Sequence, residues 1–254
     1  MKTINFTIFL YCGIFLIPHL LQAQNCSPDS SKRYQQFDAS APNNFICQII
    51  VERKKKRYNA TASFVSANVL VGAGHSFRER SFSKIRSLII YAGRHNENGI
   101  NKWLFTKKYK RKELKTFIPK RFQKKSDPDY DYAYVALPEN VTVDFFQLSQ
   151  FEKLKDHTDS IFVSGYPGDK GNKELWKKGD TPQSIVNKDA VLLYSIYTYV
   201  ADSGAPLWCR TENTYFIIGV HGTGHYHNES CNAAAKLTDK RILELRNFID
   251  KNKK

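Results

Sequence analysis

Ser203 lies in the stretch ADSGAPL, which sets its hydroxyl between an acid and a glycine, just ahead of a proline and an apolar run. Ser, Gly and Pro are ordinary β-turn residues, so a plain turn is one interpretation. The other is a nucleophile. A serine hydroxyl attacks a carbonyl only when a base takes its proton and a third group orients that base. This second interpretation requires a histidine and a carboxylate elsewhere in the chain.

Two other stretches offer those partners. His75 follows VLVGAG, an apolar run that ends in small residues able to turn tightly. Asp131 precedes Ala133, Val135 and Leu137, whose alternation predicts a strand with the acid at its start. Taken alone, His75 is also explained as a loop histidine, and Asp131 as a turn aspartate. Together they supply a base and an orienting acid, in the order His, Asp, Ser.

Short apolar runs, many of them alternating, must position these residues. They are rich in Val, Ile, Tyr and Phe and are separated by Gly, Pro, Asn and Asp, which is typical of β-strands. Only residues 239–254 change period, with apolar side chains on one helical face and Asp239 as the expected N-cap. The chain is therefore predicted to be all-β, with one C-terminal helix over about 239–251. The expected strands lie within residues 45–52, 60–72, 87–93, 132–137, 160–166, 190–200, 214–222 and 233–238.

The three stretches AGH, DYAYVAL and ADSGAPL resemble the motifs of the chymotrypsin-like serine proteases, A-[AG]-H, D-x-A-x-x-x-L and [GA]-D-S-G-x-P-L. The resemblance covers about residue 45 to the C-terminus. It implies a protease domain over 46–254, built from two six-stranded antiparallel β-barrels over about 46–140 and 158–237. It also implies a serine endopeptidase that forms an acyl-enzyme, with His75, Asp131 and Ser203 as its triad.

The resemblance further implies that the amides of Ala201 and Ser203 bind the oxyanion. Position 201 departs from the family, which has glycine there. If the turn needs a positive φ, the Cβ costs roughly 1 kcal/mol and could turn the amide away. Asp202 resembles the acid that captures the freed N-terminus in digestive zymogens, yet no obvious new N-terminus is offered.

Several stretches resemble the bacterial glutamyl endopeptidases: VSGYPGDK, then YSIYTYVADSGAPLW, then FIIGVHGTG. The implied base of the specificity pocket is Tyr197, not an acid, which disfavours cleavage after Lys or Arg. Thr198 and His221 match the positions by which these relatives grip a Glu carboxylate, and both side chains can donate to an anion. Gly222 and Gly224 would run beside the substrate backbone. His221 is equally explained as an ordinary packed strand histidine.

The first 23 residues pair a lysine with an apolar run and end in Leu-Gln-Ala, which predicts a secretory signal peptide and an extracellular product. Residues 24–45 are expected to be a loose leader or pro-segment, with maturation after Ala23 or after Arg33. No later segment is long enough to span a bilayer. Four sequons fit export through a glycosylating pathway: Asn25, Asn59, Asn140 and Asn228.

Four cysteines remain after signal removal: Cys26, Cys47, Cys209 and Cys231. An even set in an oxidising compartment predicts two disulfides. Three pairings are possible, and 26–47 with 209–231 is favoured because each closes a local loop. No metal or other cofactor is implied, since a cysteine in a disulfide cannot complete a zinc site with His225 and His227.

The net charge of +15 concentrates in residues 53–57 and 107–125. These runs are explained either as solvated loops and guarded strand edges or as sites for polyanions or anionic surfaces. The alternative to a protease is therefore a catalytically weak or inactive basic protein on the same fold that recognises polyanions. The expected partners are a protein or peptide substrate and no specific nucleic acid, and the chain is expected to be a monomer.

Overall fold

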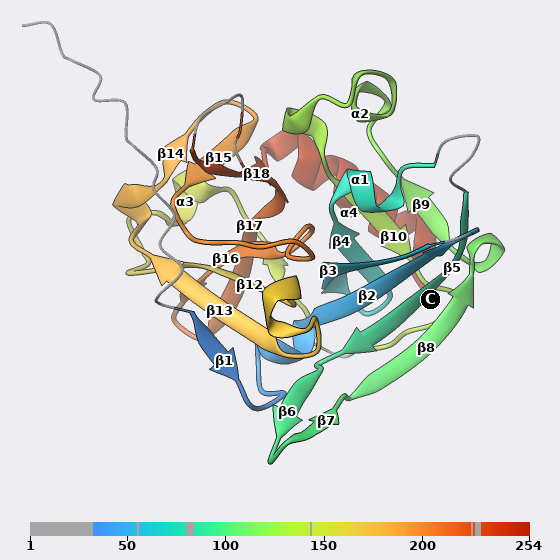
Figure 1. Cartoon of the computed structure of the whole chain (residues 1–254). Helices are drawn as coiled ribbons and strands as arrows, with labels where there is room; N and C mark the ends of the chain where they lie inside the picture. The colour runs from blue at the N-terminus through green and yellow to red at the C-terminus, as the bar shows by residue number, and fades with distance from the viewer. Residues whose placement is uncertain (1–32, 55, 80–83, 143, 225, 227–229) are drawn as a thin grey trace, which may run out of the picture.

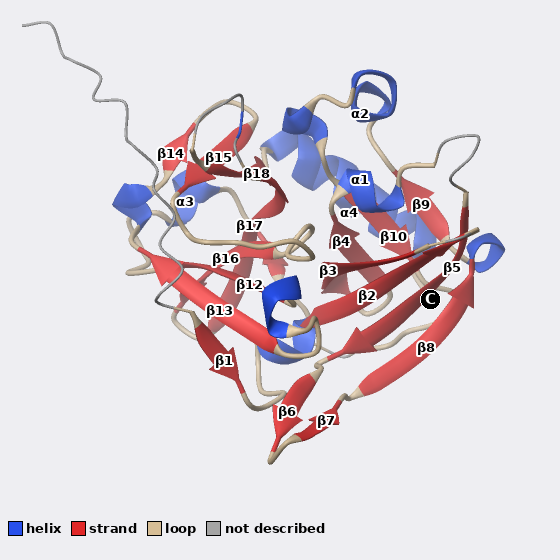
Figure 2. Ribbon diagram, viewed as in Figure 1, coloured by secondary structure: helices blue, strands red, loops and turns tan. Residues whose placement is uncertain are grey.

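The computed structural model describes residues 33–254 except 55, 80–83, 143, 225 and 227–229. These residues form two curled, barrel-like sheets that lie side by side, with a long helix at the C-terminal end (Figures 1 and 2). The predicted all-β fold with two barrels is confirmed. The described sheets contain seven and nine strands rather than six each, because short flanking segments pair at their edges.

The N-terminal sheet carries the segments that lead to His75 and Asp131. Its strand order is β8-β5-β2-β3-β4-β10-β9, and all of its pairs are antiparallel. A separate hairpin, β6 and β7, extends from it. Its interior is filled by fully buried side chains such as Ile49, Phe64 and Leu70. The strands are β2 (Ile46–Arg53), β3 (Arg57–Ser66), β4 (Val69–Gly72), β5 (Ile85–Ala92), β6 (His95–Glu97), β7 (Ile100–Lys102), β8 (Phe105–Lys110), β9 (Lys115–Phe117) and β10 (Ala133–Ala136).

The C-terminal sheet carries Ser203 and the predicted specificity residues. Its order is β1-β13-β12-β16-β17-β18-β15-β14, with β11 pairing in parallel with β17. A second core, with Ile161, Leu192 and Ile218 fully buried, fills this barrel. The strands are β1 (Tyr34–Gln36), β11 (Gln147–Leu148), β12 (Ile161–Gly165), β13 (Leu175–Asp180), β14 (Val186–Asn187), β15 (Val191–Tyr194), β16 (Pro206–Thr211), β17 (Thr214–Thr223) and β18 (Asn232–Lys236).

A third core joins the two barrels. It combines side chains of both sheets, among them Val71 and Tyr134 on one side and Trp208 and Val220 on the other. Packing of this kind fixes how the barrels face each other, because interlocked side chains leave little room to slide. The helices are α1 (Gly74–Phe77), α2 (Lys120–Lys125), α3 (Phe151–Leu154) and α4 (Asp239–Asn252).

The N-cap of helix α4 lies one residue before the expected cap, and the helix itself begins at Asp239. The hydroxyl of Thr238, not Asp239, accepts the N–H of Arg241 and is the N-cap. The buried Ile242 and Leu245 of α4 pack into the shared core. The other end reaches the N-terminal barrel, where the Asn68 side chain donates to the carbonyl of Asn252 at 2.8 Å. The helix therefore ties both barrels together.

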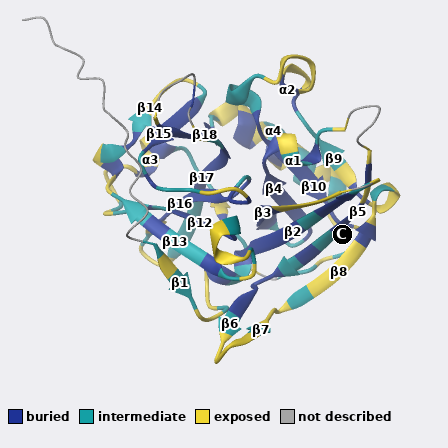
Figure 3. Ribbon diagram, in the orientation of Figure 1, coloured by how far each residue is buried: buried dark blue, intermediate teal, exposed yellow. Residues whose placement is uncertain are grey.

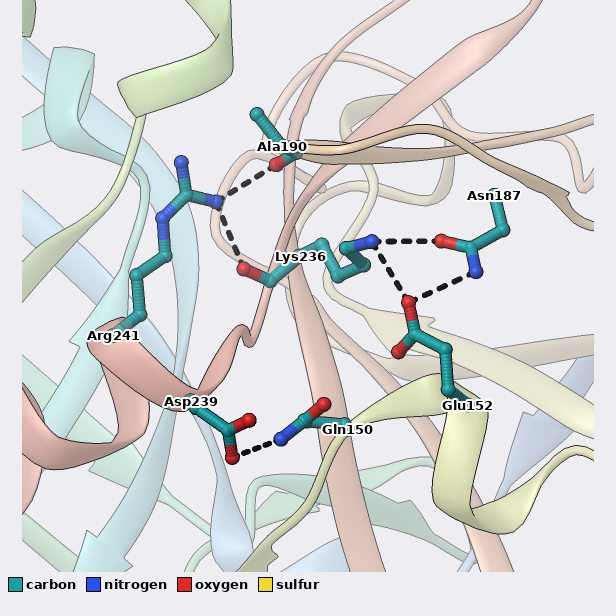
Figure 4. A network of polar contacts seen from close by, with 7 residues as sticks. All are labelled: Gln150, Glu152, Asn187, Ala190, Lys236, Asp239 and Arg241. Carbon is teal, nitrogen blue, oxygen red and sulfur yellow. Dashed lines mark hydrogen bonds and ion pairs between the residues drawn. The ribbon is translucent and has the colours of Figure 1, made fainter.

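A polar network anchors the start of α4 on the C-terminal barrel (Figure 4). The Arg241 guanidinium donates to the carbonyls of Ala190 and Lys236 at 2.7 and 2.8 Å. The buried ammonium of Lys236 donates to Glu152 at 2.9 Å and to Asn187 at 2.8 Å. A buried charge is tolerated when it is paired and hydrogen-bonded in this way.

The predicted leader is not loose over the part that the structure describes. Residues 34–36 form β1 and pair with β13 at the edge of the C-terminal sheet. Arg33 lies beside them, with its guanidinium bound to Asp169. The reason is pairing: an edge strand offers free hydrogen-bonding groups, and a short polar segment satisfies them without an apolar pattern. Residues 24–32 lie outside the described residues, and the maturation site stays a prediction.

The favoured disulfide pairings are wrong. Cys47 in β2 and Cys209 in β16 are both free and buried, each inside a different barrel core. Burial raises the pKa of the Cys47 thiol and raises that of Cys209 to about 12. Cys231 is not a free thiol. Cys26 lies outside the described residues. Spacing along the chain suggested local loops, but the strands point Cys47 and Cys209 inward.

Two of the four predicted glycosylation sites lie among the described residues. Asn59 and Asn140 are exposed, so glycosylation there stays a prediction, while Asn25 and Asn228 lie outside the described residues.

The two basic runs map to the β2–β3 hairpin and to β8 with the segment up to α2, where exposed side chains dominate (Figure 3). Among the described helices, none is long and apolar enough to cross a membrane.

The free thiols give a direct test of this correction. We expect Cys47 and Cys209 to resist alkylation in the native protein and to react fully once it is unfolded, because both are buried with raised pKa values. Peptide mapping by mass spectrometry before and after denaturation measures this. A peptide that links Cys209 to Cys231 would contradict it.

Candidate active site

His75 is held by Asp131 from a neighbouring segment. It lies in the short helix α1, directly after β4, and Asp131 lies just before β10, the strand that pairs with β4. One carboxylate oxygen of Asp131 accepts the backbone N–H of His75 at 2.7 Å, and the other lies 2.6 Å from its Nδ1. A carboxylate on Nδ1 leaves Nε2 as the nitrogen that can accept a proton. The buried acid therefore fixes both ring orientation and tautomer.

Gly74 makes this approach possible. A Cβ at position 74 would lie 3.1 Å from the Asp131 carboxylate and 3.0 Å from the ring of Phe122. The small residues before His75 thus serve close packing, in addition to the turn that the sequence suggested. The His75 side chain remains 43% exposed and opens onto the cleft between the barrels.

The Ser203 loop belongs to the C-terminal barrel but is bound to the N-terminal barrel through Thr61 of β3. The backbone N–H of Thr61 donates to the carbonyl of Ser203 at 2.9 Å. Its hydroxyl donates to the carbonyl of Ala201 at 3.0 Å and accepts the N–H of Tyr166 at 3.1 Å. Thr61 is fully buried. One residue thus fixes the position of the Ser203 loop, a role that the sequence alone did not indicate.

Gly204 allows the two barrels to approach at the same point. Its φ is +88°, and a Cβ there would lie 2.2 Å from the carbonyl oxygen of Thr61. Both the conformation and the space therefore require glycine. Its N–H donates to the carbonyl of His221 at 2.7 Å, which ties the Ser203 loop to β17.

Two backbone amides beside Ser203 are left without an acceptor. Within the described part of the chain, neither the N–H of Ala201 nor that of Ser203 donates a hydrogen bond. Unpaired buried amides are rare in proteins, so such a pair marks a place where an anion can bind. Ala201 has a φ of +79°, which meets the condition set from the sequence: the turn has the glycine-type conformation in spite of the Cβ.

Asp202 is buried behind this loop. It accepts the N–H of Tyr199 at 2.9 Å. Burial raises the pKa of Asp202 to about 7, and nearby Asp169 adds to this, while the Tyr199 N–H and the charge of Arg33 act against it. Asp202 resembles the acid that captures the freed N-terminus in digestive zymogens, and Arg33 from the N-terminal segment acts on its pKa.

The three candidate residues face one cleft of about 650 Å³. His75, Asp131 and Ser203 lie at one end, and Thr198, His221, Gly222 and Gly224 line the rest. No hydrogen bond joins Ser203 to His75 among the described residues. In enzymes without substrate such bonds are often long. The structure therefore brings every predicted triad and substrate-binding residue to one place.

His221 is a neutral donor toward this cleft. It is buried in β17, with its Nδ1 2.7 Å from the hydroxyl of Tyr194. Burial lowers the pKa of His221 to about 4, and nearby His75 lowers it further. We assign the ring proton to Nε2, with the Tyr194 hydroxyl as the donor to Nδ1. Tyr194 was not singled out from the sequence, where it read only as part of a strand.

Arg33 stands behind the wall of the cleft. Its guanidinium carbon lies 4.7 Å from the ring centroid of Tyr197, which lines the cleft. Its side chain is only 7% exposed. Nothing in the sequence marked Arg33 as more than a processing site, because its partners are more than a hundred residues away. The ion pair with Asp169 holds the guanidinium beside the Tyr197 ring.

Comparisons with known proteins agree with this geometry. The family model described as Trypsin matches residues 34–239, which is more than half of the chain. A Glu endopeptidase solved in complex with MPD is similar at 22% identity and a TM-score of 0.67, over 86% of this chain and 97% of that one. No curated protein matches.

Two further solved structures share the fold. The protease Anisep from Arthrobacter nicotinovorans is 15% identical with a TM-score of 0.59, over 81% of this chain and 93% of that one. The thermostable serine protease AL20 from an extremophilic microorganism is 11% identical with a TM-score of 0.60, over 76% and 91%. At these identities the similarity concerns the fold.

Replacing Thr61 tests the bond between the barrels. Thr61→Val keeps the shape but leaves the carbonyl of Ala201 and the N–H of Tyr166 unpaired, so we expect the free energy of unfolding to fall by about 2 kcal/mol. Thr61→Ser keeps the hydroxyl and is the matched control. Denaturant unfolding compares the two variants. Equal losses in both would contradict the assigned role of the hydroxyl.

Replacing Ala201 tests the strained turn. Ala201→Gly relieves the positive φ, whereas Ala205→Gly removes an equally buried methyl where no positive φ occurs. We expect Ala201→Gly to cost about 1 kcal/mol less stability than Ala205→Gly. Denaturant unfolding of both variants measures the difference. Equal costs would mean that Ala201 carries no strain.

Proposed function

Because the chain belongs to the trypsin family, we propose that it is an active serine endopeptidase with His75, Asp131 and Ser203 as its triad. The observation that carries this proposal is the meeting of the His75–Asp131 pair with Ser203 on one cleft, beside two amides without acceptors. An inactive relative would have no use for all of these features together.

The geometry supports the usual two-step reaction. The Ser203 hydroxyl attacks the peptide carbonyl while Nε2 of His75 takes its proton, and Asp131 stabilises the imidazolium. The N–H groups of Ala201 and Ser203 bind the oxyanion, each donor lowering the barrier by roughly 3 kcal/mol. His75 then gives its proton to the leaving amine. Water hydrolyses the acyl-enzyme by the same steps, with His75 again as base.

We further propose that the residue before the scissile bond is preferentially Glu or Asp. Thr198 and the Nε2 of His221 offer neutral donors, and Arg33, which is ion-paired with Asp169, lies behind Tyr197. Among the described residues that line this cleft, the one carboxylate is Asp131, which is already bound to His75. A Lys or Arg side chain would find no buried partner there. A carboxylate would receive charge-assisted hydrogen bonds.

The predicted signal peptide supports a further proposal, that the enzyme acts outside the cell. The alternative, an inactive basic protein that binds polyanions, would require the Ala201 amide to be turned away or otherwise occupied. In the described chain that amide has no acceptor. This favours the enzyme over the binding protein.

Hydrolysis of matched peptides tests the function. We expect a peptide with Glu before the bond to be cleaved at least tenfold faster than its Gln counterpart, because the carboxylate forms charge-assisted hydrogen bonds. Ser203→Ala should lower the rate by about a millionfold. Ser149→Ala, outside the cleft, is the control and should keep full activity.

Thr198→Val separates specificity from catalysis. We expect it to reduce the preference for Glu over Gln, since it removes one donor to the carboxylate. Cleavage after Lys or Phe in the native enzyme would keep the protease and discard the acidic pocket. A folded, processed protein that cleaves no peptide would contradict the proposed activity.

A further inference from the structure

The cleft continues past Ser203 into a second lobe of about 620 Å³. The two lobes share His75, Asp131, Val200, Ser203 and Thr223, so they meet at the reactive centre. The second lobe runs to the N-terminal barrel, where its polar walls include Arg53 and Arg78. Arg78 of this lobe was not assigned a role in binding from the sequence, and Arg53 entered only as part of a basic run.

The second lobe can receive only one part of a substrate. In the proposed reaction the side chain before the scissile bond enters the lobe with Thr198 and His221. A peptide passes Ser203 once, so the residues after the bond must leave on the other side of His75, which protonates their amine. The second lobe is assigned to that side because Arg53, Tyr58 and Arg78 of the N-terminal barrel line it and do not line the first lobe. It is therefore the site for the leaving portion of the substrate.

Arg78 presents a cation to this lobe that no carboxylate neutralises. Its guanidinium donates to the hydroxyl of Ser126 and to the carbonyl of Gln123, and its carbon lies 5.5 Å from the ring centroid of Phe122. Among the described residues it has no ion-pair partner. Neutral acceptors and an aromatic ring hold the group in place while its charge remains available.

Arg53 is held in a similar way at the end of β2. It donates to the carbonyls of Ser76 and Arg78 at 3.0 and 3.1 Å, and its carbon lies 5.7 Å from the ring centroid of Tyr58. These contacts bring it into the same wall as Arg78. Two fixed guanidinium groups on one wall suit a carboxylate, because hydrogen bonds between charged groups are strong.

The acids around this lobe are already bound. Asp131 is the only carboxylate among the lining residues that the structure describes, and it holds His75. Glu79 pairs with Arg111, and Asp127 pairs with Arg121. The described lining therefore carries two arginines and one carboxylate, so its charge is positive, although Glu79 also lies within electrostatic range of Arg53.

The positive surface extends beyond the lobe. Arg53 also lines a smaller hollow of about 430 Å³ on the β2–β3 hairpin, with Lys54, Lys56, Arg57 and Arg86. The one acid in that hollow, Glu52, is bound by Arg57, Lys108 and Ser87, and these contacts hold its pKa at about 2. A chain leaving the lobe therefore meets a row of cations.

We propose that this lobe selects peptides with acidic residues directly after the scissile bond, bound by Arg53 and Arg78. The proposal rests on the proposed function and extends it to the other side of the bond. It gives the first basic run of the sequence a role in substrate choice. The ligand is a Glu- or Asp-containing peptide segment.

Three peptides with the same Glu before the bond test this proposal. The two residues after the bond are Asp-Asp, Asn-Asn or Lys-Lys. We expect kcat/KM to be roughly tenfold higher for Asp-Asp than for Asn-Asn and lowest for Lys-Lys. The advantage should shrink as salt is raised from 0.05 to about 0.5 M, because exposed charges are screened. Equal rates for all three peptides would overturn the proposal.

Variants assign the effect to the arginines. Arg78→Gln should bring the Asp-Asp to Asn-Asn ratio close to one. Arg246→Gln, an exposed arginine on α4 outside the cleft, is the matched control and should keep the wild-type ratio. Thermal unfolding of each variant excludes a folding defect, and the salt response of the wild type remains decisive if Arg78→Gln misfolds. Asn59 lines the lobe, so protein made without N-glycans is used.

A binding measurement separates this proposal from the protease itself. If no peptide is cleaved, the proposed function fails, but the cationic lobe can still be tested. A labelled peptide with Asp-Asp should bind the full chain at least tenfold more tightly than the Asn-Asn peptide, and Arg78→Gln should remove the difference. Equal binding of both labelled peptides would overturn the lobe as an acidic site.

Discussion

The contact between Thr61 and the Ser203 loop is the constraint on which the candidate site depends. His75 and Asp131 belong to the N-terminal barrel, whereas Ser203 and the two unpaired amides belong to the C-terminal barrel. Thr61 binds the carbonyls of both Ala201 and Ser203, so it fixes the loop relative to the histidine. Gly204 lies against the same strand because it has no Cβ. A displacement of 1 Å at this seam would separate the base from the nucleophile.

Charge organises the cleft on both sides of that seam. On one side lie neutral donors, Thr198 and His221, with Arg33 behind the wall. On the other side Arg53 and Arg78 are held by carbonyls and aromatic rings. In the described lining of the two lobes the one acid is Asp131, and His75 binds it. Part of the net positive charge of the chain thus lies where a substrate would bind, and part lies on the outer strands.

The sequence predicted the elements whose pattern is local. The all-β class, the C-terminal helix and the segments around His75, Asp131 and Ser203 follow from alternation and from short motifs. It missed β8 and β13, because lysines interrupt their apolar pattern on exposed or edge faces. It placed residues 195–200 in a strand, although β15 ends at Tyr194 and the rest forms the cleft wall. Edge strands and loops near a site are where local pattern and final structure differ most.

Contacts between distant segments could not be predicted from the sequence, for a physical reason. Thr61 and Ser203 are brought together by tertiary packing that leaves no periodic trace, and the same holds for Arg33 and Tyr197. The disulfide prediction failed similarly, because short spacing suggested a loop while strand geometry buried Cys47 and Cys209 in separate cores. The positive φ at Ala201 was foreseen only as a condition, and the turn fulfils it.

The central claim is that Ser203 is an activated nucleophile, and covalent labelling tests it most directly. The full chain, after maturation, is treated with a fluorophosphonate probe that reacts with activated serine hydroxyls, and the labelled peptide is identified by mass spectrometry. The account predicts a single modification on Ser203 that disappears in His75→Ala, since the base is then missing. A folded protein in which Ser203 stays unlabelled, or is labelled equally without His75, would contradict it.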